Sequence, residues 1–113
     1  NENAIRSKLQ KLAHLYELVN DKANEIKILE CIGVGPQVRV RDLEKLCDYY
    51  RVSEDAKYKI VLVCLGNAYF ESKHYEKAIR YYKNFLEIGE ELEKKIEVLY
   101  RLIDCYTQSK DNM

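Results

Sequence analysis

The feature that most constrains this chain is a nine-residue pattern that occurs twice. "LGNAYFESK", at 65–73, and "LIDCYTQSK", at 102–110, share Leu, Tyr, Ser and Lys in register, 37 residues apart. Self-similarity at such a period is typical of repeat proteins, in which one helical hairpin stacks on the next. We therefore predict that the two segments lie on equivalent helices with one return helix between them.

Apolar residues recur every three or four positions along most of the chain, which is the spacing of an amphipathic helix. The strongest break is "GVGP", Gly33 to Pro36, which lacks the spacing of a phosphate-binding loop and is interpreted as a turn. The "VRVR" that follows, at 38–41, either begins a helix or forms a short extended piece. Asp21, Ser53 and Gly89 are predicted helix caps. The predicted helices span about 2–20, 21–31, 39–51, 54–72, 75–88 and 91–109, with a frayed end over 110–113.

Within this pattern, residues 62–82 resemble the tetratricopeptide repeat family, which packs a first helix against a return helix. The resemblance implies that small residues, Gly66 and Ala78, mark the place where the two helices cross closely. Phe85 stands where a small residue is usual, the helix-ending Pro is absent, and the offset exceeds the usual 34. The sequence is therefore similar to the longer-helix variant found in kinesin light chain-type arrays. The matching residues are Leu62, Leu65, Gly66, Tyr69, Ala78 and Tyr82.

The resemblance is clear for about residues 54–110 and weak for 1–52. Leu12 with Tyr16, and Leu46 with Tyr50, imitate the Leu and Tyr of the motif. Counting helices back from the fourth gives the first and third the parity of return helices, so either a short helix is missing or extra near "GVGP", or these echoes are coincidental. We predict an all-α fold, a single helical repeat domain over 1–113. Its parts are an N-terminal portion at 1–52, in which the assignment of helices to repeats is undecided, and a hairpin plus following helix at 53–110.

The ten tyrosines and four cysteines are expected to serve mainly in packing. Adjacent pairs, Tyr81–Tyr82 and Tyr49–Tyr50, cannot both face inward on one helix. The surplus members are either partner contacts or packing between hairpins. Without CxxC spacing, the cysteines are interpreted as buried or half-buried reduced thiols, with no metal or other cofactor. The tyrosines predicted to lie in the core are Tyr16, Tyr69, Tyr82 and Tyr106.

Composition excludes several function classes. Lys plus Arg and Asp plus Glu each number 19, and this balance argues against broad capture of nucleic acid. The longest apolar run, at 60–65, is too short to span a membrane, and no signal peptide is recognisable, so a cytoplasmic or nuclear location is expected. The chain begins at Asn1 rather than Met, as an excised fragment would. Cys64, His74 and Asp104 are weak candidates for a thiol triad, because Cys64 lies in an apolar stretch and His74 in a link, so we predict no enzyme.

The resemblance implies instead that the first helix of each repeat lines a concave groove that holds a peptide or helix of another protein. One subclass of the family clamps acidic chaperone C-terminal tails with a Lys one turn before an Asn, and a second Asn in the next repeat. Here those places hold Val63, before Asn67, and Asp104, so such tails are not expected to bind. The mixed lining better suits an amphipathic or basic partner. The expected partner-binding residues are Val63, Asn67, Phe70, Glu71, Glu97, Tyr100, Asp104 and Gln108.

A structural or self-association role is the alternative function. The last predicted helix presents Leu99, Leu102, Ile103 and Tyr106 with no return helix to cover them. That apolar face could be covered by a further repeat, by the N-terminal helices or by a second copy of the chain, as a homo-oligomer.

Overall fold

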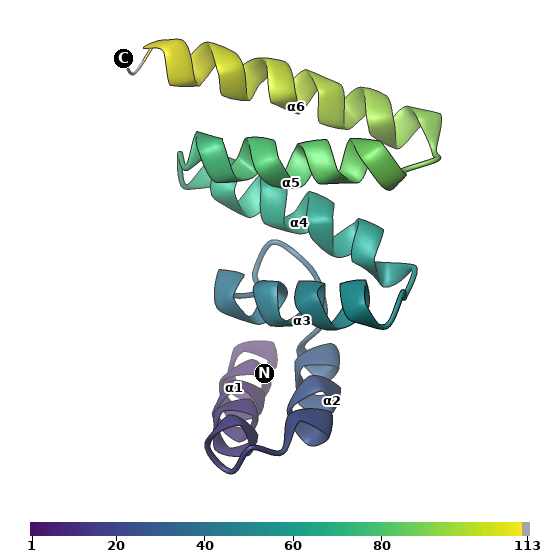
Figure 1. Ribbon diagram of the computed structural model, residues 1–113. Helices are drawn as coiled ribbons and strands as arrows, with labels where there is room; N and C mark the ends of the chain where they lie inside the picture. The colour runs from purple at the N-terminus through teal and green to yellow at the C-terminus, as the bar shows by residue number, and fades with distance from the viewer. Residues whose placement is uncertain (112–113) are drawn as a thin grey trace.

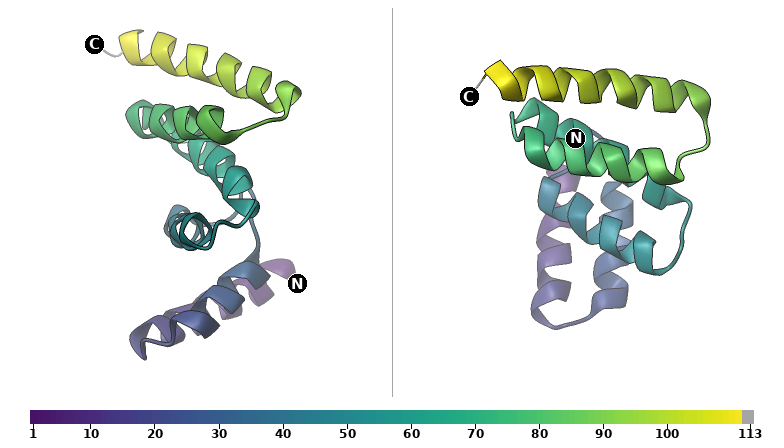
Figure 2. Two further views of the ribbon diagram at one scale, coloured as in Figure 1. Left: turned by 45° about the vertical axis from the view of Figure 1, so that its right-hand side comes forward. Right: turned by 45° about the horizontal axis from the view of Figure 1, so that its top comes forward.

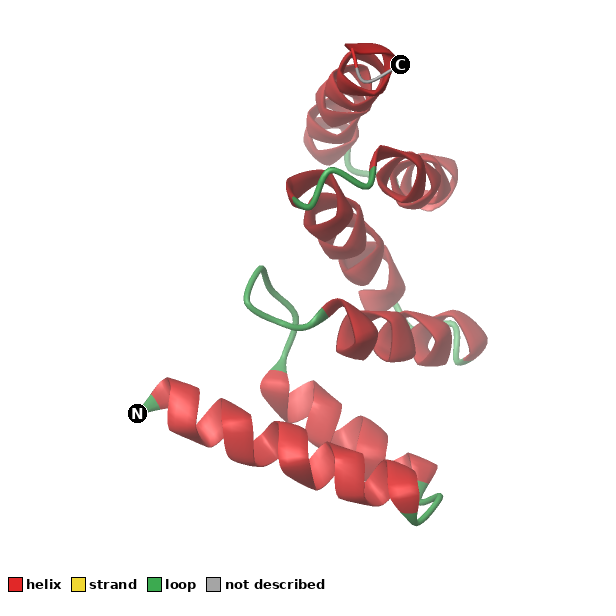
Figure 3. Ribbon diagram, turned by 90° about the vertical axis from the view of Figure 1, so that its left-hand side faces the viewer, coloured by secondary structure: helices red, strands yellow, loops and turns green. Residues whose placement is uncertain are grey.

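The computed structural model describes residues 1–111, which form six helices and, within that range, no strand (Figures 1 and 3). The predicted all-α fold of six helices is thus confirmed. The polar end predicted to fray is helical as far as Asp111, and 112–113 lie outside the described residues. The helices are α1 (Glu2–Leu18), α2 (Lys22–Ile32), α3 (Val40–Val52), α4 (Lys57–Glu71), α5 (Tyr75–Ile88) and α6 (Leu92–Asp111).

The helices stack in chain order along the long dimension of a body that measures 43 × 29 × 26 Å. Extensive contacts join each helix to the next, and they are richest between α4 and α5 and sparsest between α2 and α3. The α1–α2 hairpin lies at one end of the stack and α6 at the other (Figures 1 and 2). The N-terminal helices therefore do not cover α6, which removes one of the three possible covers for its apolar face.

The predicted helix ends at Asp21 and Gly89 are confirmed. The Asp21 side chain caps α2 by accepting a hydrogen bond from the Asn24 N–H at 3.2 Å. Gly89 ends α5, but with φ −69° it does not adopt the left-handed conformation of a usual glycine cap. Its role is steric, because a Cβ at Gly89 would come within 2.8 Å of the Phe85 ring.

The predicted N-cap at Ser53 is wrong. Ser53 is the C-cap of α3, and its hydroxyl donates to the carbonyl oxygen of Tyr49 at 2.8 Å. The next residue, Glu54, has φ 56°, a left-handed conformation that ends α3. Asp55 instead accepts a hydrogen bond from the Lys57 N–H at 2.9 Å and starts α4. A serine followed by two acidic residues can cap either end of a helix. Here the turn before Ser53 belongs to α3, so Ser53 caps the C-terminal end of that helix.

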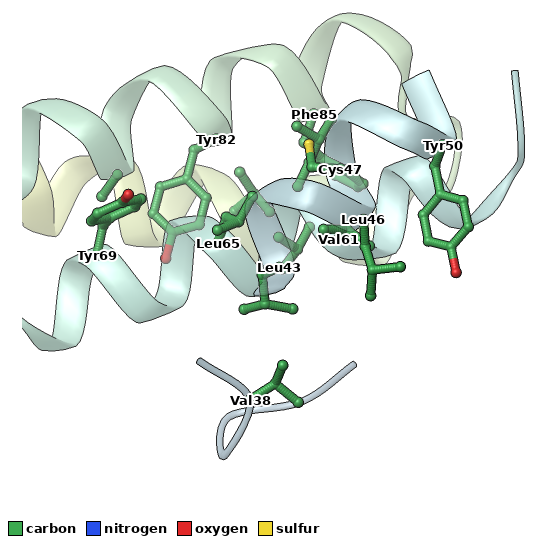
Figure 4. Packing of buried hydrophobic residues seen from close by; sticks show 14 of the residues in the cluster. Val38, Leu43, Leu46, Cys47, Tyr50, Val61, Leu65, Tyr69, Tyr82 and Phe85 are labelled. Carbon is green, nitrogen blue, oxygen red and sulfur yellow. The ribbon is translucent and has the colours of Figure 1, made fainter. Parts of the chain in front are cut away.

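The core centres on α4, which packs between α3 and α5 (Figures 3 and 4). Every residue that carries the family resemblance is buried, including Ala78 and Tyr82 at 0% exposure. A Cβ at Gly66 would lie less than 3.0 Å from ring atoms of Tyr82, closer than real Cβ contacts. Gly66 is therefore the position that lets the Tyr82 ring lie flat against α4.

Apolar residues at the two ends of the stack are more exposed than the sequence suggests. Tyr106, predicted to lie in the core, is 49% exposed, because α6 packs against α5 on one side only. Tyr16 is only half-buried, and Ile5 on the same helix and Val19, its C-cap residue, are exposed. Cys31 is also exposed, whereas Cys47 and Cys105 are buried and Cys64 is half-buried as expected.

A cluster of charged side chains joins α1, α2 and α3. Lys45 donates to Glu17 and, at 2.6 Å, to the buried carboxylate of Glu25. Arg41 also lies 3.2 Å from Glu17. Hydrogen bonding to Lys45 chiefly lowers the pKa of Glu17, to about 2. These ion pairs, together with the buried Ile26 and Leu29, hold the first hairpin on α3.

Candidate partner-binding groove

One narrow strip of α4 remains accessible between its neighbours. α4 packs against α3 and α5, and its buried residues leave a row at helical spacing on the remaining side. Within this row Cys64, Asn67 and Ala68 are half-buried, and Ile60 and Glu71 are exposed. We call Ile60, Cys64, Asn67, Ala68 and Glu71 the α4 strip.

Two hollows open along the α4 strip. The first, of about 490 Å³, lies between α4 and the α5–α6 turn and has Val63 and Phe85 among its apolar walls. The second, of about 530 Å³, lies between α4, the α2–α3 loop and Arg101 of α6. Cys64 and Asn67 line both hollows, so the two form one groove that passes Asn67. We refer to it as the α4 groove.

Asn67 is held in place from within the repeat. The Tyr82 hydroxyl of α5 donates to Asn67 Oδ1 at 2.5 Å. Burial raises the pKa of Tyr82 well above its usual range, so the hydroxyl stays protonated and remains a donor. Asn67 lines both hollows, and among residues 1–111 no hydrogen bond from its Nδ2 is made, so its two amide donors are available to a ligand. This side chain can therefore donate to a carbonyl oxygen of a ligand.

Charges of both signs border the groove. Lys59 of α4 and Lys94, Glu90 and Glu91 near the start of α6 line the first hollow, and Glu71 lines the second. Lys94 lies 3.4 Å from Glu97, which offsets part of its charge. The border is thus mixed rather than strongly basic or acidic.

Two arginines, Arg39 and Arg101, line the second hollow. Arg101 lies over the Phe70 ring, with Cζ 5.6 Å from the ring centroid, and Arg39 pairs with the buried Asp42 at 3.0 Å. Glu71, which lines this hollow, and Asp104, which lies outside it on α6, are exposed and make no ion pair within 4.0 Å among the described residues. Because Arg101 keeps its positive charge over the Phe70 ring, the charges on this side of the groove are mixed, with Glu71 as an accessible carboxylate.

The α4 residues expected at a partner site divide into three kinds of position. Asn67 and Glu71 lie in the groove wall with accessible polar groups. Val63 also lines the first hollow but is only 6% exposed, so it offers an apolar wall and little surface. Phe70 is half-buried, and its ring packs edge-on against Tyr75 at 5.8 Å and under Arg101.

The α6 residues expected at the site lie along an exposed face beyond the hollows. Tyr100 is 67% exposed, and Glu97, Asp104 and Gln108 are exposed as well. The structure brings Val63, Asn67 and Glu71 together at the α4 groove and leaves these four in a separate row on α6.

Sequence reasoning missed Arg101 and the α2–α3 loop. A signal for Arg101 was present, because the 37-residue offset that relates Asn67 to Asp104 also relates Cys64 to Arg101. The loop carried no such signal. Its Val38 is buried at the edge of the core near Leu43, which brings Pro36 and Val40 to the second hollow (Figure 4).

The remaining chemical candidates do not form a reactive site. Burial raises the pKa of the Cys64 thiol, which keeps it neutral. Exposed His74 lies in the α4–α5 turn, where its Nδ1 is 2.8 Å from the Ser72 hydroxyl. In residues 1–111 no group of three or more His, Cys, Asp or Glu side chains is arranged to hold a metal ion. No helix of that same part is both long and apolar enough to cross a membrane.

Comparison with known proteins identifies one segment. Residues 60–92, which span most of α4, all of α5 and the first residue of α6, match the family described as tetratricopeptide repeat. No curated protein matches the chain, and no solved structure matches it either. The family resemblance is therefore confirmed for α4 and α5.

Proposed function

We propose that this chain, whose residues 60–92 form a tetratricopeptide repeat, is a protein-interaction scaffold that binds a segment of another protein in the α4 groove. The repeat itself indicates a protein-binding role. The observation that carries the proposal is the position of Asn67, which is fixed by Tyr82 at the junction of two hollows with its amide hydrogens free.

The partner segment is expected to be extended at Asn67 and to offer a backbone carbonyl there. A peptide ligand has unpaired backbone groups at every residue, and one oriented side-chain donor fixes its register. An apolar side chain next to that carbonyl would enter the first hollow against Val63 and Phe85. We expect this pair of contacts to set both position and orientation.

The charge of the partner is expected to be basic. Glu71 lines the second hollow and is exposed, so it attracts Lys or Arg of a bound segment, whereas Arg39 is paired with Asp42. A bound segment that continues over α6 would also meet the exposed Asp104. An acidic C-terminal tail meets the opposite conditions. It would be repelled by Glu71 in the groove wall, and Val63 offers it no cation. An amphipathic, basic segment is therefore the favoured ligand class.

Selection from a phage-displayed library of random short peptides tests the proposal without a known partner. Enriched peptides should combine Lys or Arg with an apolar residue. Their affinity, measured by fluorescence anisotropy, should fall about three- to tenfold in Asn67→Ala, as expected for the loss of one hydrogen bond. Asn84→Ala on α5, away from the α4 groove, is the matched control and should leave affinity unchanged.

Two further variants separate the parts of the site. Glu71→Lys should weaken basic peptides more than Asn67→Ala does at low salt, and this difference should shrink as salt rises. Tyr100→Ala reports whether the bound segment continues over α6. Enriched peptides that ignore both Asn67→Ala and Glu71→Lys, or tight binding of an acidic C-terminal peptide, would refute the proposed site.

A further inference from the structure

The two ends of the stack carry apolar rows of the same length. On α6 the row is Leu92, Ile96, Leu99, Ile103 and Tyr106, each between 44% and 69% exposed. On the α1 side, Ile5, Leu12, Leu15 and Val19 are exposed by 36% to 61%, and Lys8 fills the gap between the first two. Each row has alternating steps of three and four residues and runs about 21 Å at 1.5 Å per residue.

These rows lie on the helices at opposite ends of the molecule, so one copy cannot cover its own rows (Figures 1 and 2). An exposed apolar row of this length on a helix is the surface that helix packing normally covers. Contact between α6 of one copy and α1 of the next would cover both rows at once. Pairing α6 with α6, or α1 with α1, would leave the other row exposed.

Charge favours the contact between unlike ends. The exposed charges of α6 between Leu92 and Ser109 are acidic, namely Glu93, Glu97 and Asp104, and the cations of that stretch are half-buried. Glu97 is paired with Lys94 at 3.4 Å, so Glu93 and Asp104 are the acids of that stretch without an ion pair among the described residues. The exposed charges between Ile5 and Val19 are basic, namely Lys8 and Lys11, and the acidic Glu2 lies before the row. Glu17, the acid nearest the end of α1, is already paired with Lys45 and Arg41.

Lys8 also opposes the alternative pairing of α1 with itself. A lysine within an apolar row is tolerated where the facing helix carries carboxylates and disfavoured where it faces a second lysine. Against α6, Lys8 would meet a helix face whose exposed charges between Leu92 and Ser109 are acidic.

We propose that this chain associates head to tail, with the α6 row of one copy packed against the α1 row of a second copy. The contact is heterologous, so it does not close after two copies, and the mean mass should rise beyond that of a dimer as concentration increases. The surface is separate from the α4 groove, and the proposal does not depend on peptide binding.

The test uses the whole chain and two blocking variants. Leu15→Glu places an acid in the α1 row, where it meets the acids of α6, and Leu99→Lys places a base in the α6 row, where it meets the lysines of α1. Both side chains are about half exposed, 53% and 48%, so the fold should survive, which circular dichroism checks. Val52→Glu, at a 75% exposed position on α3 outside both rows, is the matched control.

Sedimentation velocity over a concentration series gives the masses. Wild type and Val52→Glu should associate beyond dimer, and each blocking variant alone should associate at least about tenfold more weakly. Mixed in equal amounts, the two blocking variants should regain association, because the intact α6 row of Leu15→Glu can meet the intact α1 row of Leu99→Lys.

Three results would overturn the proposal. A strict monomer for wild type at all concentrations would exclude the contact. Association of Leu15→Glu alone as a dimer would show pairing of α6 with α6, and the same behaviour of Leu99→Lys would show pairing of α1 with α1.

Discussion

Substitution of Gly66 by alanine tests the close approach of α4 and α5. The added Cβ would lie less than 3.0 Å from ring atoms of Tyr82, and this ring is 0% exposed, so it cannot swing away. Overpacking of this kind costs about 3 kcal/mol at the upper end of its usual range. Alanine regains about 1 kcal/mol of helix propensity relative to glycine. The net loss in the free energy of unfolding is therefore about 2 kcal/mol.

For a chain of this size, that loss corresponds to a fall of about 8 °C in the melting temperature. Urea unfolding followed by circular dichroism gives the free energy directly. Gly35→Ala is the control, because nothing lies within 4 Å of a Cβ at Gly35. It should change stability by less than about 0.5 kcal/mol.

A double-mutant cycle decides whether the Tyr82 ring is the cause. In a Tyr82→Leu background the ring is gone, and Gly66→Ala should cost at least about 1 kcal/mol less than it does in the wild type. An equal cost in both backgrounds, or a Gly66→Ala variant as stable as the wild type, would refute the steric argument.

Three other measurements test features of the fold. Glu17 has a pKa lowered from 4.5 to about 2, so its contribution to stability is complete above pH 4.5 and lost as pH falls toward 2. In urea unfolding, Glu17→Gln should therefore be less stable than the wild type at pH 6, and its free energy of unfolding should fall less between pH 6 and 3. Tyr50→Phe removes a 2.7 Å hydrogen bond to Glu30 and should cost about 1 kcal/mol in the same assay. At pH 8, a disulfide reagent should label the exposed Cys31 first, and buried Cys47, whose pKa burial raises to about 11, only after unfolding.

The parts of the fold that the sequence predicts well are those governed by local spacing. Helical periodicity placed all six helices, and the small residues of the repeat marked the crossing of α4 and α5, because these signals act within one helix or one hairpin. Ser53 was assigned to the wrong helix because a cap residue fits either end of a helix and only the preceding turn decides.

Long-range contacts were less predictable. Tyr106 is exposed because no helix in the described part of the chain packs on the far side of α6. Val38 is buried because the α2–α3 loop lies beside α4 in the folded chain, a contact between segments far apart in the sequence. The candidate site in the α4 groove divides in the same way into a part that local sequence predicts and a part that it does not. Asn67 and its neighbours follow from the motif, whereas the hydrogen bond from Tyr82 and the loop wall of the groove required the three-dimensional structure.

The sparse packing between α2 and α3 has a consequence for how the molecule opens. In a linear stack each helix is stabilised by contacts with its neighbours, so local unfolding starts where the contacts between neighbouring helices are sparsest. Amide hydrogens of α1 and α2 should therefore exchange with solvent sooner than those of α4 and α5. A molecule in this half-open state would keep Asn67 and its tyrosine in place. It would let the α2–α3 loop move, so the second hollow would widen while the first kept its shape.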